Sequence, residues 1–266
     1  MKNQFGKTSQ LHLTTGIQEG KTVLKDLSFT APYKVMTPFR KNDGGIAVMP
    51  LCASAGIMEG DCQKISFLIQ EGSDIEYLSQ SFEKIHKMKE GYAKRETNII
   101  QEKNSIFFYH PQPVIPFRDS AFESNMEIHL EDETARFCIS EILSGGRKAY
   151  EELFTYRRYV SKIQIYRGTR LIYRDYTRYE PKARKMEEIG MYEGYTHLAS
   201  LFLSAGPDKG WEEEIASFLE EKQECEGAIT QLTYGDFAVR IFGMRSQVLE
   251  EAAEWILKSY RTWFQR

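Results

Sequence analysis

The stretch LCASAGIMEGDCQKISFLIQEGSDIEYLSQSFEKIHK, residues 51–87, decides how this chain folds. Its first part is an apolar run that enters a turn containing Gly56 and Gly60, where glycine permits a positive φ or a close backbone approach. The turn therefore predicts a chain reversal that presents Asp61 at its edge. Residues 64–70 then alternate between polar and apolar side chains with one exception, which is the period of a half-buried β-strand.

The same alternation recurs in short segments along most of the chain, and residues 9–29 predict a hairpin. Helical spacing of apolar residues appears only in the last third, where Ser246 is a plausible cap of the final helix. We therefore predict a mainly β fold with two α-helices. Its large body of stacked, β-helix-like sheets covers residues 1–195, and a β-α-β-β-α tail, residues 196–266, packs on it within one domain.

Composition excludes several classes of protein. The chain has 266 residues, a net charge of −3, 41% hydrophobic and 27% charged residues, which is ordinary for a globular protein. The acidic balance argues against a nucleic-acid partner, since phosphate binding needs a basic surface. No apolar run approaches the roughly 20 residues that span a bilayer. Residues 1–6 lack the apolar core of a secretory signal. We expect a cytoplasmic protein with no membrane partner.

The four cysteines lie far apart in the sequence, at positions 52, 62, 138 and 225, without a C-x-x-C pair. In a reducing compartment such residues are free, small core side chains. Cys52 and Cys62 flank the glycine turn, however, which leaves open that they face one another or a soft metal.

Glu141 is the most informative carboxylate. It shares the parity of apolar neighbours in the strand that we predict around residues 137–143, so it falls on the more apolar face. A carboxylate there must find a partner or shift its pKa, because an isolated buried charge is costly. The turn at Gly146 and Arg147 could bring a guanidinium back towards it. A structural Glu–Arg pair and a role in metal handling both remain open.

The sequence contains no nucleophile elbow, no H-E-x-x-H, no dinucleotide fingerprint and no P-loop. This favours a binding or assembly role over catalysis. Two alternatives from other classes are a β-rich, metal-assisted hydrolase that uses Asp61 and Glu141 as acid and base, and a small-molecule-binding or carbohydrate-binding β module that uses the tyrosine-rich hairpin of residues 162–176.

Two blocks of the opening stretch resemble the urease accessory proteins of the UreD family, also called UreH. Residues 54–61 fit its S-x-G-hydrophobic-x-x-G-D turn, and residues 79–86 fit its T/S-Q-S-F/T-x-K-hydrophobic segment, in the right order and at the right separation. Further matching blocks are residues 32–39, 111–117 and 140–147. One departure is Ala55, where many members have a second glycine. Several ordered blocks are far more specific than a single short motif.

The resemblance implies a non-enzymatic protein that helps to insert nickel into urease apoprotein. It implies binding to the accessory protein UreF, recruitment of the GTPase UreG, and nickel supply from the metallochaperone UreE. No tightly bound cofactor is expected, because the family is thought to pass nickel transiently through an internal polar route. We assign Asp61 and Glu141 to that route. The motif residues carried over are Gly56, Gly60, Gln80, Ser81, Lys84, Gly146 and Arg147.

Overall fold

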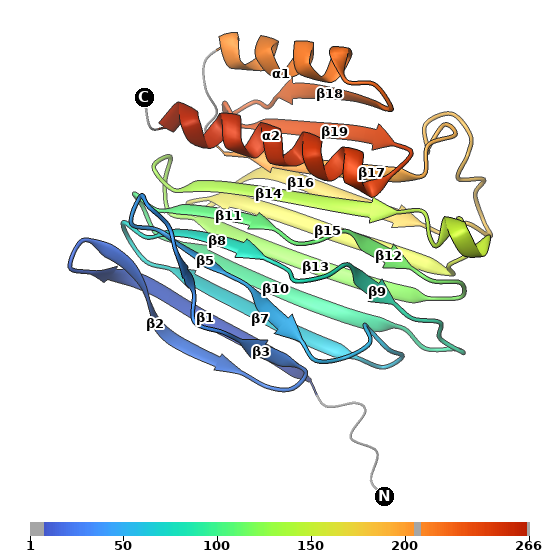
Figure 1. The fold of residues 1–266 in the computed structure, drawn as a ribbon, viewed down its shortest axis with the longest axis horizontal. Helices are drawn as coiled ribbons and strands as arrows, with labels where there is room; N and C mark the ends of the chain where they lie inside the picture. The colour runs from blue at the N-terminus through green and yellow to red at the C-terminus, as the bar shows by residue number, and fades with distance from the viewer. Residues whose placement is uncertain (1–7, 205–208, 265–266) are drawn as a thin grey trace, which may run out of the picture.

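The computed structural model describes residues 8–204 and 209–264, whose strands form two large stacked sheets (Figure 1). The first sheet has seven strands, in the order β16 (Arg170–Tyr179), β15 (Arg158–Arg167), β13 (Ala121–Leu130), β10 (Ala93–Gln101), β7 (Cys62–Ile69), β1 (Ser9–Gln18) and β2 (Lys21–Phe29). The main path of the second sheet is β18 (Cys225–Gln231), β19 (Phe237–Gly243), β17 (His197–Leu203), β14 (Arg136–Ser144), β11 (Ile106–His110), β8 (Asp74–Leu78), β5 (Ile46–Val48) and β4 (Phe39–Arg40).

The chain winds between the two sheets. It leaves the first sheet after β7, β10 and β13 and enters the second sheet as β8, β11 and β14, respectively. Because of this winding, successive strands within each sheet run parallel and pair with one another, for example β7 with β10 and β8 with β11. Antiparallel hairpins, β1 with β2 and β15 with β16, close the first sheet at both edges. This agrees with the predicted fold class, a large body of stacked, β-helix-like sheets.

Short elements complete the end of the body where the motif blocks lie. Strands β3 (Tyr33–Val35) and β6 (Pro50–Cys52) pair with each other, and β9 (Glu83–Ile85) pairs with β12 (Val114–Pro116). A 3₁₀ turn, η1 (Lys148–Tyr150), follows β14.

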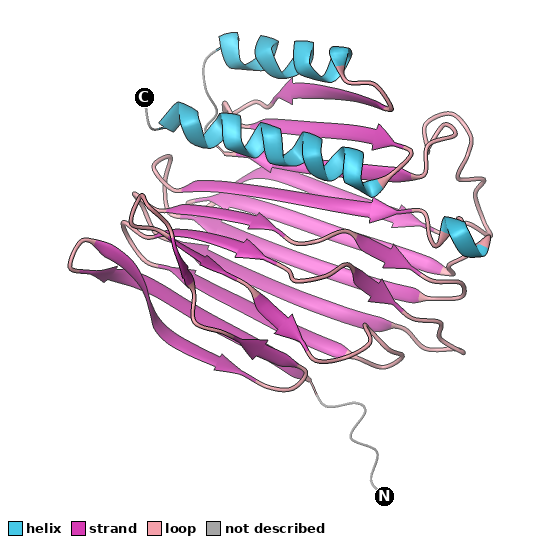
Figure 2. Ribbon diagram, viewed as in Figure 1, coloured by secondary structure: helices cyan, strands magenta, loops and turns pink. Residues whose placement is uncertain are grey.

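Two helices cover the outer face of the second sheet (Figure 2). They are α1 (Lys209–Glu221) and α2 (Ser246–Phe264), and both lie in the C-terminal third, as predicted. The apolar side of α2 packs on β14, β17 and β19, whereas α1 packs on β18. The order of elements after residue 196 is the expected β-α-β-β-α. The tail continues the body's second sheet, because β17 pairs with β14 along seven residues.

The space between the two sheets holds apolar side chains from both. One cluster includes Phe67, Ile99 and Ile128 from the first sheet and Phe107 and Phe137 from the second. A second cluster, which includes Ile85, Phe122 and Leu143, occupies the end where the motif blocks lie. Among the described residues, no helix has the length and apolar character needed to cross a membrane.

Candidate functional site

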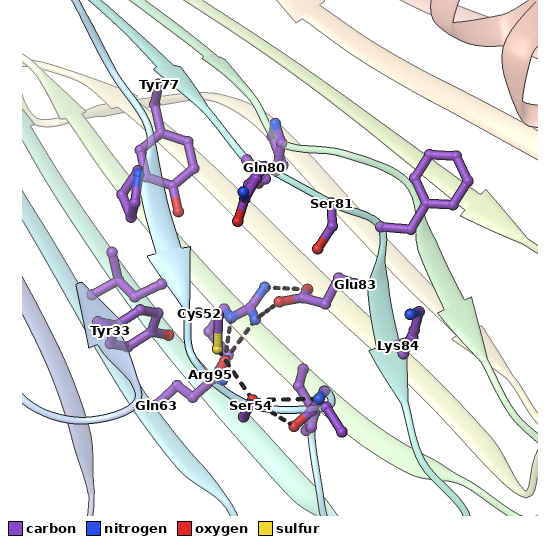
Figure 3. Close-up of a pocket in the computed structure, with 18 of the residues that line it drawn as sticks. Tyr33, Cys52, Ser54, Gln63, Tyr77, Gln80, Ser81, Glu83, Lys84 and Arg95 are labelled. Carbon is purple, nitrogen blue, oxygen red and sulfur yellow. Dashed lines mark hydrogen bonds and ion pairs between the residues drawn. The ribbon is translucent and has the colours of Figure 1, made fainter. Parts of the chain in front are cut away.

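The two motif blocks of the opening stretch meet at one cavity of about 170 Å³ (Figure 3). Residues 54–57 line it from the glycine turn, and residues 79–84 line it from the second block. Gln80, Ser81 and Lys84, carried over from the family motif, are therefore neighbours in space. Sequence reasoning grouped these blocks by resemblance, and the fold gives a physical reason for the grouping.

Gly56 makes this meeting of the two blocks possible. Ile57 donates its backbone N–H to the carbonyl of Lys84 at 2.8 Å, and His86 donates to the carbonyl of Ile57 at 2.9 Å. Gly56 has a φ of +143°, and a Cβ there would collide with the Lys84 carbonyl oxygen. A side chain at this position would push the two blocks apart.

Asp61 shapes the turn. Its carboxylate accepts the backbone N–H of Met58 at 2.7 Å, and Gly60 before it has a φ of +81°. The positive φ that the sequence suggested for Gly60 is confirmed. The neighbouring Glu59, which sequence reasoning missed, accepts three consecutive backbone N–H groups from residues 89–91 at 2.6–3.2 Å. These hydrogen bonds lower the pKa of Glu59 below its ordinary value.

Arg95 lies at the cavity wall and was not singled out from the sequence. Its guanidinium donates to both carboxylate oxygens of Glu83 and twice to the amide oxygen of Gln63, with Nε to Gln63 at 2.8 Å and Nη1 to Glu83 at 2.7 Å. The Arg95 side chain is only 12% exposed. The inward position of Arg95 could have been predicted from the strand alternation, because it shares the parity of residues 93, 97 and 99, which are buried.

Arg95 belongs to a row of polar side chains that crosses the inner face of the first sheet. The strand register aligns Gln63 with Arg95, Arg95 with Ser124, Ser124 with Ser161, and Ser161 with Thr177. Gln63, Ser124 and Ser161 are each at most 7% exposed. Packing alone does not explain why five adjacent strands each place a polar side chain at the same register position of a buried face, because burying polar groups is costly. This row therefore requires another explanation.

The second sheet contributes a facing row. Glu141 on β14 is aligned with Ser200 on β17, and Ser200 with Arg240 on β19. Arg240 donates to the Ser200 hydroxyl and forms an ion pair with Asp175 of β16 at 2.7 Å. We call these facing residues the polar row, with Glu83 and Arg95 at its cavity end and Asp175 and Arg240 at its other end.

Glu141 lies on the inner face of β14, as its parity in the strand predicted, and belongs to the polar row. Its carboxylate has no hydrogen bond or ion pair to any described residue. Burial, followed by the nearby negative charge of Asp175, raises the pKa of Glu141 to about 7. Arg95 and Arg240 both oppose this rise, so Glu141 senses the ion pairs at both ends.

Several buried hydroxyl groups near the row are also unpartnered among the described residues. They are the hydroxyls of Tyr33, Thr97 and Ser161. A buried polar group without a protein partner in a native fold is ordinarily satisfied by water or an ion. Together with the carboxylate of Glu141, these atoms give the space between the sheets several polar groups without a partner among the described residues.

The structure corrects the suggested pairing of Arg147 with Glu141. Arg147 instead binds both oxygens of Glu152, at 2.7 and 2.8 Å, and lies 3.8 Å over the ring of Phe117. Gly146, with a φ of +133°, lets the backbone pass against the Glu152 carbonyl. The short η1 turn brings Glu152 round to Arg147, a local contact that strand parity could not reveal. Glu141 is thus left without the structural partner that the sequence offered.

The other sequence candidates have ordinary surroundings. Cys52 is exposed and lies 3.3 Å from the Ser54 hydroxyl, and all four cysteines are free. Within residues 8–204 and 209–264, no three His, Cys, Asp or Glu side chains are grouped to hold a metal ion. No described contact joins Asp61 to Glu141. In the tyrosine-rich hairpin, Tyr173 packs against the apolar cluster between the two sheets, whereas Tyr176 is exposed.

Comparison with known proteins identifies the family. The family model of the UreD urease accessory protein matches residues 7–266. The chain belongs to the UreD family. It is 38% identical to the urease accessory protein UreD of Acetivibrio thermocellus, over 94% of this chain and 96% of that protein. It is 33% identical to the urease accessory protein UreH of Helicobacter pylori strain P12, over 96% of each chain.

Membership of the UreD family confirms the resemblance drawn from the motif blocks. It also confirms the expectation of an accessory factor rather than an enzyme. The two blocks that carried the resemblance are those that line the cavity at one end of the polar row. The family signature and the buried polar groups of this UreD chain thus coincide in space.

Proposed function

We propose that this UreD-family protein assists nickel insertion into urease apoprotein by passing Ni²⁺ along the polar row between its two sheets. The observation that carries the proposal is Glu141, a half-buried carboxylate on the inner face of β14 with no hydrogen-bond or ion-pair partner among the described residues. Stability alone would favour an apolar residue at such a position. A free carboxylate among orphaned hydroxyls is, in contrast, a suitable resting point for a hydrated cation.

The donor chemistry fits a transient cargo. Ni²⁺ accepts imidazole, carboxylate and water ligands, and tight sites bring several of these together. The row offers separate oxygen donors, Glu141, Ser161 and Ser200, rather than a closed cage. Such donors would hold the ion weakly enough to release it. We expect at best roughly micromolar affinity, as for a few oxygen ligands without thiolates.

The partners in this proposal come from the family. The UreD chain would act in the cytoplasm as a non-enzymatic scaffold in a complex with UreF and the GTPase UreG. GTP hydrolysis by UreG would drive delivery, and the metallochaperone UreE would supply the nickel.

A plug in the polar row tests the proposal. Ser161 points into the row, whereas Gln164 on the same strand has the opposite parity, so Ser161→Leu and Gln164→Leu form a matched pair. Each variant is co-expressed with urease and the other accessory proteins, and urease activity and bound nickel are measured. We expect Ser161→Leu to lower both several-fold while the accessory complex still forms, and Gln164→Leu to change neither.

Overpacking at Ser161 is expected to cost about 1–3 kcal/mol, so thermal unfolding of both variants is the control. Normal nickel loading by a folded Ser161→Leu protein would contradict the proposed route. Normal urease maturation in the absence of this chain would contradict the accessory role itself.

A further inference from the structure

Each end of the polar row carries an ion-paired guanidinium, Arg95 at the cavity end and Arg240 at the other. At the cavity end, Arg95 is fixed by four hydrogen bonds, two to Glu83 and two to Gln63. Figure 3 shows the guanidinium between these two partners at the cavity wall. Because both partners lie on elements that form the cavity, Arg95 occupies the junction between the cavity and the interior.

The opposite end has the same construction on different strands. Arg240 of β19 forms an ion pair with Asp175 of β16 at 2.7 Å and donates to the Ser200 hydroxyl. The Asp175 side chain is 17% exposed and that of Arg240 39%, so the pair lies where the row meets the surface. Glu141, without a cationic partner, lies between the two ends.

This arrangement is unfavourable for free passage of a metal ion. A divalent cation that passes a fixed guanidinium within a few ångströms is repelled, and the repulsion is stronger in a protein interior than in water. Neither arginine is needed to neutralise Glu141, which lacks an ion pair with either of them. Each instead neutralises its own carboxylate, Glu83 or Asp175. An ion-paired arginine on each side of the unpaired Glu141 would make entry to the polar row depend on the charge of the entering ion or molecule.

We infer that Arg95 and Arg240 are charge gates that keep cations out of the polar row until the Glu83–Arg95 or Asp175–Arg240 pair opens. The inference rests on the proposed nickel route and adds its control step. A cation reaching Glu141 must displace a guanidinium from its carboxylate, and the released carboxylate then becomes a ligand. Opening of the ion pair and binding of the cation would thus be a single step, in which the carboxylate exchanges its guanidinium for the metal ion.

The gates can be tested by measuring access to the position of Glu141. The full chain, with its four cysteines replaced by serine or alanine, receives Glu141→Cys as a reporter thiol. Two small thiol reagents that differ in charge are compared: Ag⁺ is cationic, and methyl methanethiosulfonate is neutral. Their reaction rates are measured with Arg95 intact and in the Glu83→Gln/Arg95→Gln double variant, which removes the gate without leaving an unpaired carboxylate.

We expect the double variant to raise the Ag⁺ rate by about tenfold or more, a change of about 1.4 kcal/mol in the barrier, while the neutral probe changes much less. Asp175→Asn/Arg240→Gln should act in the same direction. Arg95→Lys keeps the charge and should leave the Ag⁺ rate low. Arg147→Gln/Glu152→Gln is the matched control, since it removes a bidentate Arg–Glu pair outside the row.

Equal acceleration of both probes would show that Arg95 only fills space, and an unchanged Ag⁺ rate would overturn the gate outright. If the Glu141→Cys protein does not fold, Ser161→Cys serves as the reporter in the same row. Failure of the nickel route is a separate outcome, because Ser161→Leu would then leave nickel loading of urease normal whatever the Ag⁺ rates are.

Discussion

The two faces of the second sheet are both buried, yet they are built differently. Its outer face meets α1 and α2 through a cluster of apolar side chains, and two polar groups within it are paired: Trp211 Nε1 donates to the Ser259 hydroxyl at 2.9 Å, and the Tyr260 hydroxyl donates to the Ser204 carbonyl. Its inner face meets the first sheet through apolar clusters interrupted by the polar row, where Glu141 and several hydroxyls have no partner among the described residues.

The comparison separates stability from function. Around Trp211 and Tyr260, the outer face shows that this sequence can pair polar groups that it buries in an apolar cluster. The inner face retains polar groups at a cost, since a buried polar group without a partner destabilises a fold by about 1–3 kcal/mol. Four predictions test this contrast, ordered from the largest expected effect to the smallest.

The stability of the helix-covered face should depend on the volume of its buried side chains and hardly on pH. Leu249 is fully buried there, and Leu249→Ala should lower the free energy of unfolding by about 3–4 kcal/mol through lost burial and a residual cavity. Chemical denaturation at several pH values measures this. The loss should be independent of pH between 5 and 8.5, and a pH-dependent loss would show that this face is not the dry one.

The stability of the cavity end should depend on how closely the backbone at Gly56 approaches that at Lys84. Gly56→Ala places a Cβ against the Lys84 carbonyl at a strained φ and should cost about 3 kcal/mol. Gly60→Ala is the matched control: its φ is also positive but its Cβ would meet nothing within 4 Å, so we expect about 1 kcal/mol. Thermal unfolding distinguishes the two, and equal losses would remove the close approach as the cause.

Glu141→Gln should stabilise the protein at alkaline pH. The folded pKa of about 7 lies above the ordinary 4.5, so the wild-type protein is favoured with Glu141 protonated and loses that advantage as pH rises from 4.5 through 7. The variant avoids this loss, which amounts to at most about 3 kcal/mol above pH 7. Denaturation at pH 5 and pH 8.5 measures it. Equal stability of both proteins at pH 8.5 would mean that Glu141 has a partner.

Asp61→Asn should have the smallest effect. Asparagine keeps an oxygen that can accept the Met58 N–H, so we expect a change below about 1 kcal/mol in unfolding free energy. The hypothesis that Asp61 also serves the nickel route stays a prediction, and the same variant tests it. Normal stability with reduced urease activation would assign its charge to nickel transfer, whereas normal activation would restrict Asp61 to the turn.

Sequence alternation predicted much of this architecture and one member of the polar row. The parity of residues 137–143 correctly placed Glu141 between the sheets, and helical spacing predicted α1 and α2. Arg95 was missed, although it lies in β10 and shares the parity of the buried residues 97 and 99.

The polar row itself could not be derived from the sequence. Ser124 and Ser161 are unremarkable serines in the sequence, and only the pairing register of distant strands aligns them with Arg95. The partner of Arg147 was also wrong, because a 3₁₀ turn decides it locally. Alternation along one strand predicts which face a residue occupies, but register across strands is a tertiary property.

The measurement that tests the central claim most directly is nickel loading of urease by Glu141→Gln. The variant is co-expressed with urease and its accessory proteins, and its unfolding free energy and complex formation are determined in parallel. If the polar row carries nickel, a folded, complex-forming Glu141→Gln protein should load far less nickel than wild type. Full nickel content and urease activity with this variant would contradict the account, and Glu141 would then be a costly residue without a role in transfer.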